Sequence, residues 1–320
     1  MKNKLMVILL LLLTVLLGGC AREKPAAVGS YRPSVKEMVI TYVQAPLNVP
    51  SIVAKERRSY EEAYKNWGMP FAYANLTTGA EQTAALASGD IQILNCVGAA
   101  SVLIAASSGA DVKILSVYAN SPQAFQLFSR DKELNSPQSL KGKTIAGPKG
   151  TISHELLAAY LHKGGLRMED VKFVSMSLPA ARAALEAGKV DAALQPGPMA
   201  YTAAKAGLHL VTNGEGLVSG LTVTATSKKF YDANKPLVEA FLQVQKDTLK
   251  YMQEHREEVL GMTAKATQLS SEAVETMYTF YDFSPAITAQ TKQELAKTQD
   301  FLLQAGMLAQ KVDVDSLFLR

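Results

Sequence analysis

Cysteine is scarce in this chain, with Cys20 and Cys96 the only two among 320 residues. Cys20 is assigned another role below, so no disulfide is expected. The four histidines and the remaining cysteine do not stand at the spacing of metal ligands. We therefore expect neither a metal site nor a cofactor.

A dominant charge of one sign is absent as well. The chain has 33 Lys and Arg residues against 29 Asp and Glu residues, and two of the lysines lie in the first 19 residues. No basic stripe is interleaved with aromatic residues. A nucleic-acid binder would show such a stripe and a larger positive excess. The composition therefore predicts no nucleic-acid partner.

Familiar catalytic motifs are missing too. The sequence contains no G-x-S-x-G, no G-x-x-x-x-G-K-[ST] and no H-E-x-x-H. Its acidic pairs, such as Glu61-Glu62 and Glu257-Glu258, fall in stretches that are typical of solvated helices. The sequence favours binding without chemistry, so we do not expect an enzyme.

The beginning of the chain indicates export. Lys2 and Lys4 precede the apolar run Leu5–Leu17, which is too short for a transmembrane helix and typical of a signal peptide. Leu17-Gly18-Gly19-Cys20 then resembles the bacterial lipobox, which implies a lipid such as palmitate on Cys20; the alternative is an ordinary signal peptide with a chance cysteine. We expect a signal peptide at 1–19 and a lipidated tether at 20–35.

One stretch occurs twice. Ala184–Pro198 reads ALEAGKVDAALQPGP, and Ala85–Gly98 reads ALASGDIQILNCVG, at a constant offset of 99 residues. Each copy is typical of a helix end, a glycine stop, a short buried strand and a turn into a new helix. This repetition predicts two similar α/β lobes, although A-L-x-x-G is common enough at helix ends to arise by chance.

The order of expected elements supports two lobes. Strands alternate with helices through both halves, which predicts an α/β protein whose lobes each hold a mainly parallel sheet flanked by helices. The expected strands are 38–43, 71–76, 91–94, 112–117, 143–146, 171–176, 190–194, 208–211 and the strand-like 221–226; a single helix is expected at 52–67. We assign lobe 1 to 36–120 plus 222–320, lobe 2 to 128–213, and a two-crossing hinge to 121–127 and 214–221. A helical C-terminal extension from Leu237 should coat lobe 1.

The candidate binding site follows from this topology. Ligands bind in open α/β sheets at the carboxyl ends of strands, where helix N-termini present free N–H groups that suit an anion. Loops of both lobes should face one cleft there. The candidate ligand-binding residues are Gln44, Asn48, Thr78, Gly79, Asn95, Gly98, Thr151, Ser153, His154 and Gln195.

Several of these residues have a second interpretation. Thr78 and Thr151 could cap helices, with Thr78 and Glu81 at capping-box spacing. Asn48 could bond its own loop, and His154 could be solvated. Cys96 is interpreted as a small buried hydrophobe rather than a nucleophile. Tyr118 and Phe125 belong either to the core or to the cleft lining, and Lys149 would attract anions without direct contact.

The glycines of these loops suggest a test. Gly79 and Gly150 would allow a ligand to approach the backbone closely. We therefore expect Gly79→Val and Gly150→Val to block binding without unfolding the protein.

The motifs together resemble the solute-binding proteins of ABC importers. Leu140-Lys141-Gly142-Lys143-Thr144-Ile145-Ala146 with Gly150-Thr151-Ile152-Ser153-His154, and Ala181-Arg182-Ala183-Ala184-Leu185 with Gly188-Lys189-Val190-Asp191-Ala192, are similar to the branch for aliphatic sulfonates, taurine, nitrate and thiamine-pyrimidine precursors. The resemblance implies a type II periplasmic-binding-protein fold. It also implies lobes that close on a small, anionic organic solute.

One departure bears on the ligand. Sulfonate binders of this branch tend to carry an aromatic-rich stretch ending in Trp-Asp-Pro where this chain has Leu194-Gln195-Pro196-Gly197-Pro198. Because that stretch lacks an acid and a Trp, it offers no partner for the ammonium of a taurine-like ligand.

The resemblance also implies partners and a place. It implies a protein outside the cytoplasm, anchored by lipid to a bacterial membrane, that delivers its solute to an ABC permease with an ATPase. We expect a monomer, because the sequence has no coiled-coil pattern and no apolar stripe that would need a partner. A ligand-sensing lipoprotein that signals to a membrane receptor is the alternative. An enzyme of thiamine-pyrimidine biosynthesis is less favoured, because the Cys-rich iron motif is missing.

Overall fold

The protein is built on two five-stranded sheets, each flanked by helices. The computed structural model describes residues 31–43, 47–76 and 78–319, and Ser34–Arg320 form one compact unit. The first sheet has the order β2-β1-β3-β10-β4 and the second β7-β6-β8-β5-β9. The strands are β1 Met38–Thr41, β2 Phe71–Ala74, β3 Ile93–Gly98, β4 Lys113–Ala119, β5 Phe125–Ser129, β6 Thr144–Gly147, β7 Lys172–Ser175, β8 Ala192–Pro196, β9 His209–Asn213 and β10 Thr222–Thr226.

Each sheet contains one reversed strand. β10 is antiparallel to both β3 and β4, and β5 is antiparallel to both β8 and β9, while the other four strands of each sheet run in one direction. The expectation of two mainly parallel α/β sheets is therefore confirmed. We call the part with the first sheet lobe 1 and the part with the second lobe 2.

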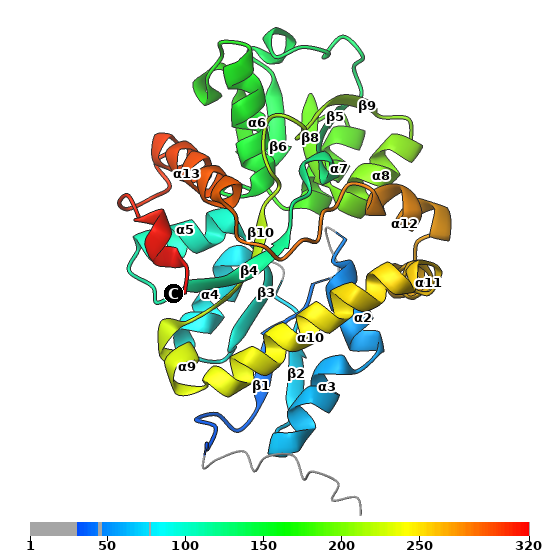
Figure 1. Cartoon of the computed structure of the whole chain (residues 1–320). Helices are drawn as coiled ribbons and strands as arrows, with labels where there is room; N and C mark the ends of the chain where they lie inside the picture. Colours follow the sequence, from blue (N-terminus) through cyan, green and yellow to red (C-terminus); the bar gives the residue numbers. More distant parts are fainter. Residues whose placement is uncertain (1–30, 44–46, 77, 320) are drawn as a thin grey trace, which may run out of the picture. The chain divides into compact units, whose positions relative to one another are not determined.

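The reversed strands mark the two crossings between the lobes. β5 is the first strand after the chain leaves β4 of lobe 1, and β10 is the first after it leaves β9 of lobe 2 (Figure 1). The strand at Phe125–Ser129 was not expected, and it begins inside the segment 121–127 that we assigned to the hinge. The exact domain and hinge boundaries stay a prediction.

The repeated sequence stretch occupies equivalent places in the two lobes. β3 and β8 are the central strands of their sheets, and they begin 99 residues apart, at Ile93 and Ala192. The helices before them, α4 Gly79–Ser88 and α7 Leu178–Glu186, keep the same offset. The helices after them are α5 Ala99–Ser107 and α8 Gly197–Lys205. The constant spacing in the sequence therefore corresponds to one α-β-α unit used twice.

One expected helix is wrong. Residues 52–67 do not form a single helix, because Arg58 adopts a left-handed backbone conformation with φ of 54° and interrupts it. The segment instead forms α2 Val49–Glu56, α3 Ser59–Tyr64 and a 3-10 turn at Lys65–Trp67. The remaining helices are α6 Ile152–Lys163, α9 Lys228–Ala233, α10 Lys235–Glu254, α11 Arg256–Thr267, α12 Ser271–Tyr278 and α13 Ala289–Gln304, with short 3-10 turns at Pro122–Ala124, Gln138–Leu140, Met168–Asp170 and Val314–Leu317.

The C-terminal helices coat lobe 1, as expected. α10 packs on α2 and α3, and α13 packs on α5, with Leu295 and Leu302 buried in the core of lobe 1. The same extension also reaches lobe 2, where α12 contacts α8 and α13 contacts α6 (Figure 1). Between these two helices Asp282 pairs with Asn120. A third segment therefore runs beside the two crossings.

None of the helices in the described ranges is long and apolar enough to cross a membrane. The signal peptide assigned to 1–19, the lipidation site Cys20 and the tether as far as residue 30 lie outside the described part of the chain.

Candidate functional site

The best-ordered polar cluster of the candidate site lies in lobe 1, where α2 begins beside the end of β3. Asn95 on β3 donates from Nδ2 to Ser51 Oγ over 3.0 Å. The Ser51 backbone N–H, in the first turn of α2, donates to the Tyr118 hydroxyl over 3.1 Å, and the two hydroxyls are 2.7 Å apart. All three residues are buried. A free N–H at the start of α2 is thus satisfied by a side chain of β4.

Asn95 is held at its backbone and at the nitrogen of its amide, but not at the amide oxygen. Its N–H donates to Thr41 Oγ1 over 2.7 Å, and the Thr41 hydroxyl donates back to its carbonyl over 3.1 Å. The Asn95 Oδ1 atom is buried and has no hydrogen-bond partner among the described residues. Such atoms are rare in folded proteins because they cost about 1–3 kcal/mol. A rotated amide would offer an N–H at the same place.

Cys96 occupies a bulge in β3. Val97 and Asn95 face the adjacent residues Val223 and Thr224 of β10, so Cys96 is the extra residue between them, and its φ is 71°. Bulges re-aim side chains next to functional sites. The Cys96 thiol donates to Asn48 Oδ1 over 3.1 Å. Burial raises the pKa of this thiol to about 12, while hydrogen bonds with Thr222 and Asn48 oppose the rise.

Asn48 therefore has two roles at once. It precedes α2, and its Nδ2 donates to the Val43 carbonyl over 2.7 Å, as in the interpretation that it bonds its own loop. Its Oδ1 also accepts the Cys96 thiol, which ties this loop to the central strand. Gln44, another predicted ligand residue of this loop, lies outside the described residues.

Two helix N-termini of lobe 1 touch each other. Thr78 caps α4 in a complete capping box, since its side chain accepts the Glu81 N–H and the Glu81 carboxylate accepts the Thr78 N–H. Gly79, the first residue of α4, lies against Ser101 in the first turn of α5, and a Cβ at Gly79 would come within 2.5 Å of Ser101 Cβ. Gly98 precedes α5, and a Cβ there would meet only Ser101 Oγ, at 4.0 Å. Sequence reasoning missed Ser101, because nothing in its helix distinguishes it locally.

In lobe 2 the predicted residues cluster at the start of α6. Thr151 precedes this helix, but its hydroxyl donates to the Pro148 carbonyl over 2.9 Å, so it does not cap α6. Ser153 is buried in the first turn. His154 is buried between Phe173, on which it stacks at 4.5 Å, and Phe301 of α13 at 5.5 Å. This ring is not solvated.

His154 is neutral in this position. Its Nδ1 accepts the Gly150 N–H over 3.3 Å. Burial, and then the charge of Lys149, lower the pKa of His154 to about 4. Among the nine described candidate residues, only His154 is ionisable in the ordinary range. The described part of the candidate set is therefore uncharged at neutral pH.

Gln195 is the counterpart of Cys96 under the offset of 99 residues. It is fully buried in β8, and its Nε2 donates to the Leu178 carbonyl over 3.4 Å. Its Oε1 has no partner among the described residues. Both central strands thus carry a buried amide with an unpaired oxygen, on Asn95 in lobe 1 and on Gln195 in lobe 2.

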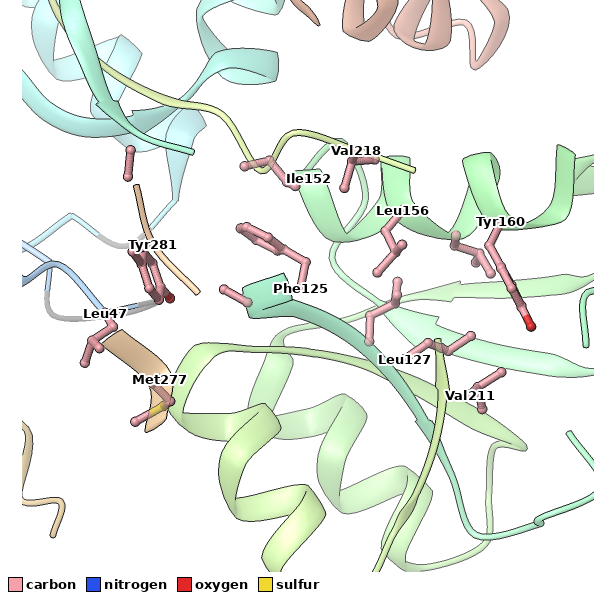
Figure 2. Close-up of a cluster of buried hydrophobic side chains, with 14 of the residues drawn as sticks. Leu47, Phe125, Leu127, Ile152, Leu156, Tyr160, Val211, Val218, Met277 and Tyr281 are labelled. Carbon is pink, nitrogen blue, oxygen red and sulfur yellow. The ribbon is translucent and has the colours of Figure 1, made fainter. Parts of the chain in front are cut away.

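An apolar cluster runs without interruption from lobe 1 into lobe 2. Figure 2 shows Leu47, Met277 and Tyr281 on one side of Phe125, with Leu127, Leu156 and Val211 on the other side. Ile152, the first residue of α6, belongs to the same cluster. Phe125 and Tyr118 therefore join the two lobes in one apolar layer.

Substituting the site glycines would disturb the fold, contrary to our expectation. A Cβ at Gly79 would overlap Ser101, and a Cβ at Gly150 would overlap the Met307 side chain. Gly150 also has a φ of 74°, which L-residues rarely adopt. The Gly79→Val and Gly150→Val variants would thus lose packing rather than only the binding of a ligand.

Within the described ranges, no group of three or more His, Cys, Asp or Glu side chains is placed to hold a metal ion. What the lobes present instead is a set of neutral polar groups beside apolar side chains. Such a mixture is the usual lining of a small-molecule site.

Comparison with known proteins gives a consistent result. The family model described as NMT1/THI5 like matches residues 49–259. A Bacillus subtilis (strain 168) protein, provisionally named an aliphatic sulfonates-binding protein, is 26% identical over 323 residues, which cover 98% of this chain and 95% of that protein.

Solved structures agree on the fold. The alkanesulfonate-binding protein SsuA from Xanthomonas axonopodis pv. citri, bound to MOPS, superposes with a TM-score of 0.80 at 25% identity, covering 90% of this chain and all of that one. The periplasmic aliphatic sulphonate-binding protein SsuA from Escherichia coli gives 0.79 at 20% identity, covering 90% of this chain and 93% of that one. The expected two-lobe fold of a periplasmic binding protein is confirmed.

Proposed function

Because the chain belongs to the NMT1/THI5-like family, we propose that it is the extracytoplasmic solute-binding component of an ABC importer whose ligand is a small organic sulfonate with an uncharged tail. Similarity along nearly the whole chain to sulfonate-binding proteins supports the class of protein and its place outside the cytoplasm. The sulfonate and its tail are inferred from the residues of the site.

The observation that carries the ligand class is the pairing of neutral polar groups with an apolar layer. A sulfonate stays ionised at every physiological pH, so it needs hydrogen-bond donors rather than a proton acceptor. Helix N-termini and neutral side chains supply such donors. If the Asn95 amide rotates so that its oxygen, in place of its nitrogen, meets the Ser51 hydroxyl and accepts from it, the amide N–H points to the position of the unpaired oxygen and is free for a sulfonate oxygen.

The uncharged tail of the ligand is inferred from the apolar side chains of the site. Leu47, Phe125 and Ile152 are buried members of the cluster that joins the lobes. An alkyl or aryl tail packed there gains about 25 cal/mol for each Å² removed from water. A taurine-like ammonium would need a carboxylate instead, and none stands among the described candidate residues.

We propose the following cycle. A solute binds between open lobes, and contacts from the second lobe then favour closure, as a population shift driven by differential affinity. The closed protein docks on a membrane permease, whose ATPase supplies the energy. A lipid on Cys20 would hold the protein near that permease and raise its effective concentration. Intact mass spectrometry of the membrane-extracted protein tests the anchor: a Cys20→Ala variant should lose the lipid mass.

The site itself is tested by calorimetry with hexanesulfonate. Asn95→Ala should weaken binding about tenfold or more, since one hydrogen bond to a charged group is worth about 1.5–3 kcal/mol. Asn135→Ala, the same change at an exposed position of lobe 2, is the matched control and should bind like the wild type. Equal affinities for all three proteins would remove Asn95 from the site.

A further inference from the structure

α13 and α6 form a contact between the lobes that neither crossing segment provides. α13 belongs to lobe 1, since Leu295 and Leu302 are fully buried in the cluster that contains Leu103 of α5. α6 belongs to lobe 2, where it packs on β5 and β8. The two helices contact each other (Figure 1). Any movement that opens the lobes must therefore separate them or slide one along the other.

Contacts at this junction concentrate at the start of α6. Phe301 of α13 meets the ring of His154 edge-on. Thr298 of α13 donates from Oγ1 to Glu155 Oε1 over 2.8 Å. Both Thr298 and His154 are buried, and Glu155 is partly buried. Glu155 is the one acidic residue in the first turn of α6, and the hydrogen bond described for its carboxylate is to the other lobe.

Few charges offset this carboxyl. From α13, Glu294 faces it, and Glu294 is itself paired with Lys297 at 2.8 Å. Lys149 lies in the loop before α6, on the side of His154. β5, β8 and α5 carry no charged side chain. Burial raises the pKa of the Glu155 carboxyl to about 7, the Thr298 bond opposes the rise, and Glu294 adds to it.

We propose that Glu155 and α13 form a proton-dependent latch, in which the carboxyl takes up a proton as the lobes close, so that external pH regulates closure. The inference rests on the proposed function for its effect on solute affinity. The latch itself acts without a solute, because the Glu155–Thr298 contact depends only on the two helices.

The direction follows from proton linkage. When the lobes are apart, the Glu155 carboxyl regains solvent and its ordinary pKa of 4.5. The group binds a proton more tightly in the closed form, so closure is favoured at low pH and the advantage is lost as pH rises through about 7. Between pH 6 and 8 the ratio of closed to open protein should fall by up to about tenfold and then level off.

Protonation of His154 at the same junction would oppose closure, but most of the contacts of this ring are within lobe 2 and do not change when the lobes separate. Its Gly150 hydrogen bond and its Phe173 stack both lie within that lobe. A comparison of the wild type with a Glu155 variant at each pH cancels the contribution of His154, and also any titration of the solute.

The test uses the full-length protein in detergent, without solute, and measures hydrogen exchange in peptides from α6 and α13 between pH 6 and 8. Glu155→Gln keeps the shape and the acceptor for Thr298 but removes the titration. The ratio of wild-type to Glu155→Gln exchange should rise by up to about tenfold over this range. Glu294→Gln should move the midpoint to lower pH, because it removes a negative neighbour.

Glu272→Gln is the matched control. Glu272 of α12 pairs with Lys205 of α8 at 3.8 Å, so it too joins the lobes, but both side chains are exposed. It should follow the wild type at every pH. A constant ratio of wild-type to Glu155→Gln exchange from pH 6 to 8 would overturn the latch.

Affinity gives the second readout. Calorimetry with hexanesulfonate, whose charge does not change in this range, should show the wild-type affinity falling relative to Glu155→Gln by the factor by which the closed fraction falls. Failure of the wild type to bind hexanesulfonate at any pH would count against the proposed ligand, while the exchange experiment would still decide the latch.

Discussion

The contact between Gly79 and Ser101 allows a prediction with an unusual sign. Gly79 begins α4, and alanine at a helical position ordinarily stabilises a protein by about 0.4–1 kcal/mol relative to glycine. Here the added methyl carbon would lie within 2.5 Å of Ser101 Cβ, so rotation of the serine hydroxyl cannot relieve the overlap. The two helices would have to separate, and overpacking of this kind costs about 1–3 kcal/mol.

We therefore expect Gly79→Ala to lower the free energy of unfolding by about 1 kcal/mol, and by at most about 2.6 kcal/mol, the overpacking cost less the gain of an alanine. Urea unfolding followed by circular dichroism at 222 nm measures this value. Gly261→Ala is the matched control, because Gly261 lies inside α11 with no atom near its missing Cβ. That variant should be stabilised by up to about 1 kcal/mol.

A second substitution identifies the cause. Ser101→Gly removes both atoms that a methyl at Gly79 would meet, and on its own it should cost up to about 1 kcal/mol as a glycine in a helix. In the double variant the penalty of Gly79→Ala should disappear, which gives a favourable coupling of about 1 kcal/mol or more. The reasoning is refuted if Gly79→Ala is as stable as Gly261→Ala, or if the two changes are simply additive.

Three further predictions concern buried groups. Tyr118→Phe should cost about 1–3 kcal/mol in urea unfolding, because it leaves the Ser51 N–H without its partner; an unchanged midpoint would contradict the bond. Cys96, with its pKa raised to about 12, should resist iodoacetamide at pH 8 until the protein is unfolded in urea, and rapid alkylation of the native protein would show that the thiol is not buried. His154 has a lowered pKa of about 4, so the unfolded chain binds its proton first, and the contribution of His154 to stability should fall by up to about 3 kcal/mol as pH drops from 6.5 towards 4. Because the raised pKa of Glu155 acts in the opposite sense, the test compares the wild type with His154→Gln at each pH, and identical pH slopes would contradict the assignment.

Local signals in the sequence located the repeated unit well. The glycine stops and the short apolar runs predicted the central strands β3 and β8, because both features act within a few residues. Thr78 and Glu81 predicted a capping box for the same reason, and the structure shows it complete. The two-lobe α/β fold could therefore be predicted from the sequence.

Features that depend on distant contacts could not be predicted in this way. Arg58 interrupts a helix that periodicity alone would continue. Cys96 lies in a bulge because β3 pairs with β10, a strand that follows the whole of lobe 2 in the sequence. Glu155 and Thr298 are separated by 143 residues, and nothing near either one indicates the contact.

The candidate site was predictable in outline rather than in its partners. Asn48, Asn95 and Gln195 were identified from their loops, and each is buried in the structure. Ser51, Ser101 and the apolar layer were missed. A serine in the first turn of a helix, or a leucine in a loop, has the same local sequence pattern whether or not it lies at a site. Their participation in binding remains a prediction until a ligand is measured.

The most direct measurement of the central claim is thermal unfolding with hexanesulfonate, hexanoate and taurine at equal concentrations. A solute at 100 times its Kd stabilises a protein by about 2.7 kcal/mol, which at this size raises the midpoint by several degrees. The account predicts such a shift with hexanesulfonate and smaller shifts with hexanoate, which has the wrong head group, and with taurine, which has the wrong tail. Stabilisation by hexanoate or taurine but not by hexanesulfonate would contradict it.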